Sequence, residues 1–225
     1  MAQIFVSHSA RDEEYKNFFN KAFATSSVTA KYEEIEQLEK GLITTADIDS
    51  DITFSSAVFV LLSRNVDSLL HTRDWIGYEV GFAKGGQGGN KDVWCFEHVS
   101  DVGSLSKVIP NFDHYVVYDT SDTALLYMKR IVESYDEGRV LRNMALGAGG
   151  GAALVEENRL GGALGGALVS LIYSTLSTDR PQGIEVTCQC RLKYRIHIPE
   201  HFQTYRCTKC NNWFYKPGVM VPLEA

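Results

Sequence analysis

The sequence has no excess of basic charge, no strongly biased composition and no apolar leader at its N-terminus. Its 225 residues carry a net charge of −6, which argues against a protein that binds nucleic acid through a global basic surface. With 44% hydrophobic and 22% charged residues, the chain is not mainly disordered, collagen-like or a coiled-coil rod. The N-terminus has no basic stretch followed by an apolar core, so we expect no signal peptide and a cytoplasmic protein.

The distribution of charge divides the chain into three parts. Residues 1–143 have a net charge of −8, residues 144–178 of −1 and residues 179–225 of +3. The middle part is rich in glycine, and the last part holds four of the five cysteines. A chain of this length is typical of one full domain with smaller additions. We therefore expect a domain at 1–143, a glycine-rich segment at 144–178 and a small cysteine-rich domain at 179–225.

Short apolar strands alternate with helices along the first part. The pattern predicts strands at 4–7, 28–32, 57–62, 93–96 and 115–118, and helices at 13–23, 43–52, 75–83 and 123–134. The run 57–62 is apolar throughout, which is typical of a strand buried on both faces. The alternation predicts an α/β fold with a parallel, doubly wound sheet. Ligands of such sheets bind beyond the carboxyl ends of the strands, so we expect the site in the loops after Ser7, Tyr32 and Ser63.

Two pieces of the sequence carry candidate chemistry. Trp75 and Glu79 are four residues apart and share a face of the predicted helix. A carboxylate beside an indole is partly desolvated, so it can act as an acid, a base or a stabiliser of a cation. A solvated glutamate beside a core tryptophan is the alternative. The first loop, with Ser7, His8 and Ser9, is the second piece. Its alternative is a purely structural role, in which Ser9 or Asp12 caps the following helix.

Four motifs occur in a characteristic order. They are FVSHSARDEE after the first strand, KYEE with Gly41 after the second, the central strand SSAVFVLLS, and W-x-x-x-E on the following helix. Together they resemble the Toll/interleukin-1 receptor (TIR) domain, especially its prokaryotic branch, over residues 1–140. The resemblance implies a flavodoxin-like parallel sheet. The second loop is more acidic and slightly longer than is usual in that family.

Many TIR domains of that branch cleave NAD, and several act in immune defence. The resemblance implies that Glu79 is the catalytic residue and that NAD is the substrate. It also implies that Trp75, the first loop with Ser7, His8 and Ser9, and the second loop around Glu33 to Gly41 border the substrate cleft. Ser63, at the end of the third predicted strand, is a further candidate substrate-binding residue.

Cleavage of the bond between nicotinamide and ribose develops an oxocarbenium ion, which a carboxylate stabilises. Attack by water would give ADP-ribose, and attack from the adenine end would give a cyclic product; the sequence leaves this choice open. Two other functions also remain open, a non-catalytic TIR adaptor and an enzyme like the nucleoside deoxyribosyltransferases. The intact W-x-x-x-E motif favours an enzyme over an adaptor. The lack of a clear second carboxylate near Asp113 or Asp119 argues weakly against the transferase.

The last part of the chain contains a candidate metal site. Its cysteines are Cys188, Cys190, Cys207 and Cys210, and four thiolates satisfy a structural, tetrahedral Zn²⁺. The arrangement resembles a zinc ribbon, although the first pair has one intervening residue instead of two. His197 and His201 are alternative ligands. We expect this unit to bind a protein partner in preference to nucleic acid.

The glycine-rich segment has three interpretations. Its Gly-x3-Gly spacings, such as Gly161 with Gly165, allow close helix packing. A helical hairpin that drives formation of a homo-oligomer is favoured. Membrane contact through residues 144–176 is possible but not favoured, because the uncharged run 160–176 only reaches the lower limit for a span. A flexible linker is the third interpretation.

Overall fold

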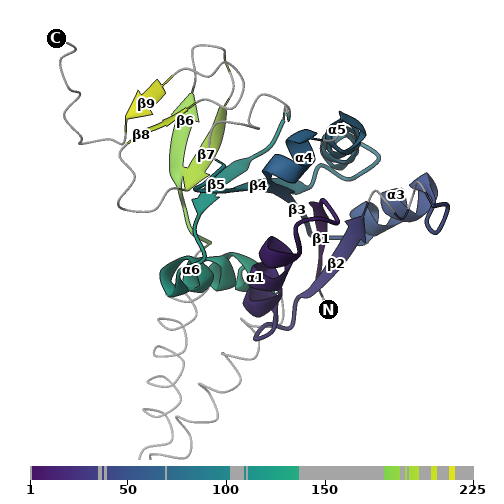
Figure 1. Cartoon of the computed structure of the whole chain (residues 1–225), viewed down its shortest axis with the longest axis horizontal. Helices are drawn as coiled ribbons and strands as arrows, with labels where there is room; N and C mark the ends of the chain where they lie inside the picture. The colour runs from purple at the N-terminus through teal and green to yellow at the C-terminus, as the bar shows by residue number, and fades with distance from the viewer. Residues whose placement is uncertain are drawn as a thin grey trace, which may run out of the picture.

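The described part of the chain forms a seven-stranded β-sheet (Figure 1). The computed structural model describes residues 2–34, 37, 40–68, 70–101, 109, 111–136, 180–187, 191, 193–197, 204–206 and 213–215. The strands of this sheet are β1 (Gln3–His8), β2 (Thr29–Glu34), β3 (Ala57–Leu62), β4 (Asp92–His98), β5 (His114–Tyr118), β6 (Ile184–Thr187) and β7 (Lys193–His197). Their order is β2-β1-β3-β4-β5-β7-β6. The first five strands are all parallel and have the 2-1-3-4-5 order of a flavodoxin-like sheet.

Helices cover both faces of the sheet, as the doubly wound prediction requires. They are α1 (Glu13–Phe23), α3 (Thr45–Phe54), α4 (Arg64–Ser68), α5 (Leu70–Lys84) and α6 (Asp122–Glu133). Helices α1 and α6 pack together on one face, and α3 and α5 on the other (Figure 1). Two apolar cores result, one on each side of the sheet.

The central strand β3 belongs to both cores. All six of its residues are buried, because β1 and β4 pair with its two edges and helices cover its two faces. Val58 and Val60 point to the α3/α5 core, whereas Phe59 and Leu61 point to the α1/α6 core. This alternation explains why the run Ala57–Leu62 has no polar residue.

The strands and helices predicted in the first part are confirmed, with two differences. Helix α5 begins at Leu70, earlier than the predicted start at residue 75. Its first turn includes the fully buried Thr72, a polar residue that the apolar periodicity did not mark. The short helix α4 (Arg64–Ser68) was not predicted, because five residues are too few for a helical pattern to emerge.

The C-terminal part contributes two strands to this same sheet, which differs from the separate cysteine-rich unit expected at 179–225. Strand β7 pairs in parallel with β5, and β6 pairs antiparallel with β7. The backbone N–H of Arg195 donates to the carbonyl of Asp113 at 2.8 Å. The outer edge of β5 would otherwise expose unpaired backbone groups, and β7 satisfies them. Strands β8 (Thr204–Arg206) and β9 (Trp213–Tyr215) form a second, antiparallel pair.

A buried histidine pair joins β7 to β5. His114 Nδ1 lies 3.1 Å from His197 Nε2, and His197 Nδ1 is hydrogen-bonded to the Tyr127 hydroxyl. The ring of Trp94 stacks on His114 with 3.7 Å between centroids. Burial lowers the pKa of His114 to about 4 and that of His197 to about 3, so both rings are neutral at physiological pH. Since both His197 nitrogens are engaged, His197 is not available as the alternative zinc ligand.

Arg180 makes a second connection between the C-terminal part and the domain. Its guanidinium forms an ion pair with Asp92 at the start of β4. It also lies over the ring of Tyr135, 4.4 Å from the centroid. The Tyr135 hydroxyl in turn donates to Asp92 and accepts from the Trp94 indole N–H at 2.7 Å. The chain is thus fixed to the sheet immediately before β6.

Several expectations fall on residues outside the described part. The glycine-rich segment 144–178 and the four cysteines Cys188, Cys190, Cys207 and Cys210 are among these residues. Self-association through the glycines and zinc binding by the cysteines therefore remain predictions. Of the helices that the structure describes, none is long and apolar enough to cross a membrane.

We predict that Gly183→Ala weakens attachment of the β6–β7 pair. A Cβ atom at Gly183 would lie 2.6 Å from the His197 ring, and the residue has a φ of +57°, which disfavours alanine. The free energy of unfolding should fall by about 1–3 kcal/mol in urea titrations. Gly86→Ala is the matched control, because a Cβ there meets no atom within 4 Å. Equal unfolding midpoints for the two variants would contradict the packing described for His197.

Candidate active site at the carboxyl end of β1

Glu79 of α5 reaches the carboxyl end of β1. Helix α5 packs on the sheet through Ile76 and Val80, in the same core as Phe5 of β1. Glu79 lies on this inward side of the helix and is only 1% exposed. The Ser7 hydroxyl donates a hydrogen bond to Glu79 Oε2. Two of the residues expected at the site, 72 positions apart in sequence, are therefore in direct contact.

The environment of Glu79 favours its protonated form. Burial raises the pKa of Glu79 to about 8, and the negative charge of Glu33 acts in the same direction. The hydrogen bond from Ser7 and the nearby indole of Trp75 lower the pKa, but by less. At neutral pH the carboxyl group is therefore mostly neutral, and small changes in its surroundings can ionise it. A pKa close to the working pH is typical of acid–base groups at functional sites, although buried structural groups also have shifted values.

Trp75 lies one turn before Glu79 on α5. Its ring stacks on Tyr78 with 4.9 Å between centroids. The Tyr78 hydroxyl donates to Asp49 of α3 at 2.8 Å, which fixes the outer side of this aromatic pair. Among the described residues no group forms a hydrogen bond with the buried Trp75 Nε1. The indole nevertheless lies close enough to the Glu79 carboxyl to lower its pKa, so it belongs to the polar surroundings of that group.

Glu33 is a second buried carboxyl beside this site. It is the register partner of Ser7 across the β1–β2 pair, so its side chain lies on the same face of the sheet. Glu33 Oε1 accepts from Lys31 Nζ at 3.1 Å, and Lys31 also contacts Asp51 at 3.4 Å. Burial raises the pKa of Glu33, although Lys31 opposes this. The motif KYEE marked the strand end, but no pattern distinguished Glu33 from its acidic neighbours.

His8 is on the opposite face of the sheet from the Glu79 carboxyl. Successive residues of a strand alternate between faces, and the His8 ring contacts Tyr32 edge-on at 5.4 Å. Lys16 of α1 lies over the same tyrosine ring, which places His8 and Tyr32 on the α1 side. Ser9 is fully buried, and its hydroxyl oxygen accepts from the Arg11 N–H at 3.3 Å. The first loop thus divides its expected site residues between the two faces.

Ser63 belongs to a polar cluster at the beginning of α1. Its hydroxyl donates to Asp12 Oδ2 at 2.6 Å, and Asn65 Nδ2 donates to Asp12 Oδ1 at 2.6 Å. Asp12 is the N-cap residue of α1, but its side chain makes no capping hydrogen bond. Its carboxylate joins the loop after β1 to the loop after β3 instead. The sequence indicated Asp12 as a cap and did not indicate Asn65, because the partners are more than 50 residues apart.

Neither aspartate considered for a transferase lies in contact with Glu79 in the described geometry. Asp113 precedes β5 at the amino end of the sheet, where it pairs with Lys84 at 2.9 Å. Asp119 follows β5 and accepts from the Ser121 N–H at 3.0 Å. Their positions suit local structural roles.

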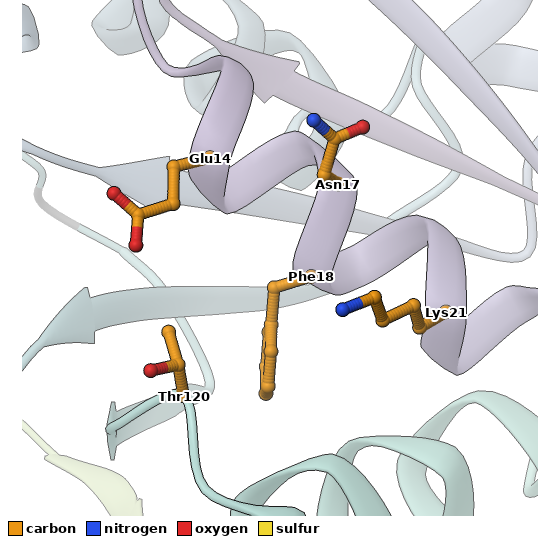
Figure 2. A pocket seen from close by; sticks show the side chains of 5 residues that line it. All are labelled: Glu14, Asn17, Phe18, Lys21 and Thr120. Carbon is orange, nitrogen blue, oxygen red and sulfur yellow. The ribbon is translucent and has the colours of Figure 1, made fainter.

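A cavity of about 460 Å³ lies on the other side of the sheet. Figure 2 shows the side chains that line it, which are Glu14, Asn17, Phe18 and Lys21 of α1 and Thr120 after β5. None of the predicted site residues is among them. The cavity and the Glu79 carboxyl therefore belong to separate places in the fold.

The comparisons with known proteins identify no relative. The chain matches no protein-family model, and neither the curated proteins nor the solved structures include a significant match. In the part of the chain that the structure describes, no three His, Cys, Asp or Glu side chains are grouped to hold a metal ion. The site is therefore interpreted from its own chemistry.

We predict that Glu79→Gln stabilises the protein as the pH rises. The raised pKa means that the folded state holds the Glu79 proton more tightly than the unfolded state. This contribution is fully present below the unfolded pKa near 4.5 and is lost as the pH rises through about 8. Glutamine needs no proton, so its advantage should grow from pH 5 to pH 9, reaching roughly 3 kcal/mol at pH 7 and roughly 5 kcal/mol at pH 9. Urea unfolding of both proteins between pH 5 and pH 9 measures this difference in the free energy of unfolding.

The matched control is Asp74→Asn, the same chemical change at an exposed position of α5. Comparison of the two variants separates the effect of burial from that of replacing a carboxyl group by an amide. A pH-independent difference between wild type and Glu79→Gln would contradict a raised pKa for Glu79.

Proposed function

We propose that this protein is a TIR-type enzyme that cleaves NAD, with Glu79 as the catalytic residue. The observation that carries the proposal is the contact of a buried Glu79 with Ser7 at the carboxyl end of β1. The strand order of the sheet is compatible with the TIR resemblance, and ligands of such sheets bind at this end of the strands. The prokaryotic resemblance further suggests a role in immune defence.

The reaction needs one carboxylate at the site. The nicotinamide of NAD is a pyridinium cation, so it can leave without receiving a proton. As its bond to the ribose breaks, positive charge moves to the sugar as an oxocarbenium ion. An ionised Glu79 stabilises this charge, and its effect is strong because the surroundings are apolar. Water or a nucleophile of the adenine end then completes the reaction.

Binding of the substrate would itself prepare Glu79. A cation within a few ångströms favours the ionised form of a carboxyl group. The pyridinium ring can therefore lower the pKa of Glu79 from about 8 and release its proton. The Ser7 hydroxyl donates to the carboxylate and keeps it oriented. Because Glu79 is 1% exposed, the groups that cover it must move before NAD can reach it.

The proposal is tested by nicotinamide release from NAD with the purified full chain, with and without extract of infected cells. Mass analysis of the second product distinguishes ADP-ribose from a cyclic isomer. Glu79→Gln should lower kcat by about 10²–10³-fold, the usual loss when a group that stabilises transition-state charge is removed. Asp74→Asn, on the same helix, should stay within about twofold of wild type.

Retention of more than about a tenth of wild-type turnover by Glu79→Gln would remove Glu79 from the catalytic role. If wild-type protein releases no nicotinamide under any of these conditions, the NAD-cleaving function is wrong and the non-catalytic adaptor is favoured.

We also propose that the C-terminal part binds one structural Zn²⁺. In sequence, Cys188 and Cys190 lie between the paired strands β6 and β7, and Cys207 and Cys210 lie between β8 and β9. Two cysteine pairs, each in the connection of an antiparallel strand pair, suit a four-thiolate site. Zinc would hold these connections together and would take no part in the reaction at Glu79.

Metal analysis of protein purified without chelator should give one zinc per chain. The double variant Cys207→Ser with Cys210→Ser should lose the metal, because two thiolates cannot complete a tetrahedral site. Cys95→Ser is the control, since this buried cysteine lies in β4. Zinc-free wild-type protein would overturn the assignment.

A further inference from the structure

Two buried glutamates lie on the α3/α5 side of the sheet, although the proposed reaction needs only one carboxyl group. Glu79 and Glu33 are 1% and 6% exposed, and both flank Ser7. Glu79 does so through its hydrogen bond, and Glu33 through the β1–β2 register. Burial of a charged group without full compensation is costly, so a second buried carboxyl beside the first needs an explanation.

Lys31 compensates Glu33 only in part. Its ammonium contacts Glu33 Oε1 and Asp51 but is itself 44% exposed, so solvent and salt screen it. Glu33 Oε2 is buried, and it has no hydrogen-bond partner in the described part of the chain. One oxygen of Glu33 is thus held by Lys31, and the nearby Asp51 carboxyl raises the pKa of Glu33 further.

Glu33 is also the charged group that acts on Glu79. On this side of the sheet, Glu33 of β2 interacts with Lys31 of the same strand and with Asp51 of α3. The negative charge of Glu33 raises the pKa of Glu79. Two like charges that share a low-dielectric site cannot both ionise easily, so the presence of one retains a proton on the other.

We propose that Glu33 is a positioning residue of the same site, which keeps Glu79 protonated until a cationic substrate such as the pyridinium of NAD enters. This role rests on the proposed function, because it presupposes that Glu79 acts on a cation. Once ionised, the two carboxyl groups can balance the positive charge of such a substrate. When the cation enters, Glu79 releases its proton to solvent and both carboxylates face the substrate. Without a cation, Glu79 stays neutral and the closed site is less costly to fold.

The test measures the titration of Glu79 directly. Carbon-13 NMR of protein with labelled glutamate carboxyl groups follows each side chain with pH, and the resonance absent from Glu79→Gln identifies residue 79. In Glu33→Gln the Glu79 midpoint should fall by roughly one pH unit. In a plot of NAD cleavage against pH, the midpoint of the rise in activity should shift to lower pH by the same amount. Activity at pH 7 should therefore increase. Glu13→Gln, the same change on the α1 side, should leave both unchanged.

A second variant covers the case in which Glu33→Gln does not fold. Glu33→Thr removes the same charge with a residue that strands favour, and it should lower the Glu79 midpoint similarly. An unchanged midpoint in the folded variants would overturn the proposal. If the midpoint falls but wild-type protein releases no nicotinamide, the coupling of the two carboxyls stands and the NAD-cleaving function fails.

Discussion

Burial of β3 on both faces is the constraint on which the rest of the structure depends. A strand with six apolar residues needs a neighbour at each edge and helices above and below it. Strands β1 and β4 pair with its two edges, α1 and α6 cover one face, and α3, α4 and α5 cover the other. Because these strands are parallel, their carboxyl ends meet at one edge of the sheet. Ser7 of β1 and Glu33 of β2 come together there for this reason.

The burial of Glu79 has opposite effects on folding stability and on the proposed chemistry. The inward face of α5 is mostly apolar near the sheet, with Ile76 and Val80 in the core and Thr72 as a second buried polar residue. A carboxyl group at this place remains neutral near pH 7, because ionisation would leave its charge desolvated. The same desolvation makes the ionised group effective at stabilising a cation. A residue that only stabilised the fold would be expected to be apolar at this position.

The C-terminal strands β7 and β6 extend the sheet beyond β5. Strand β7 covers the edge of β5, and the neutral pair of His114 and His197 fills the space beside Trp94. The ion pair of Arg180 with Asp92 fixes the start of this addition. Strands β6 and β7, which flank Cys188 and Cys190 in the sequence, therefore belong to the same sheet as β1, whose Ser7 contacts Glu79.

Most of the described helices and strands of the N-terminal part follow from the sequence pattern. Apolar runs and helical spacing indicated β1–β5, α1, α3, α5 and α6, because each of these patterns depends on neighbouring residues. The same patterns brought Glu79 and Ser7 forward as candidates, with the help of a family resemblance. They also placed the site at the carboxyl ends of the strands, which follows from parallel pairing alone.

Which of these candidates are in contact depends on how the helices and strands pack. The tertiary structure joined Glu79 to Ser7, placed His8 on the other face, and bound Ser63 to Asp12, since such contacts link residues more than 50 positions apart. It also added the buried Glu33 beside Glu79. The spacing of residues along the sequence does not predict these contacts. Burial and proton affinity depend on which helices and strands pack against a side chain. The attachment of β7 to β5 was undetermined for the same reason, as an open strand edge can accept any suitable strand.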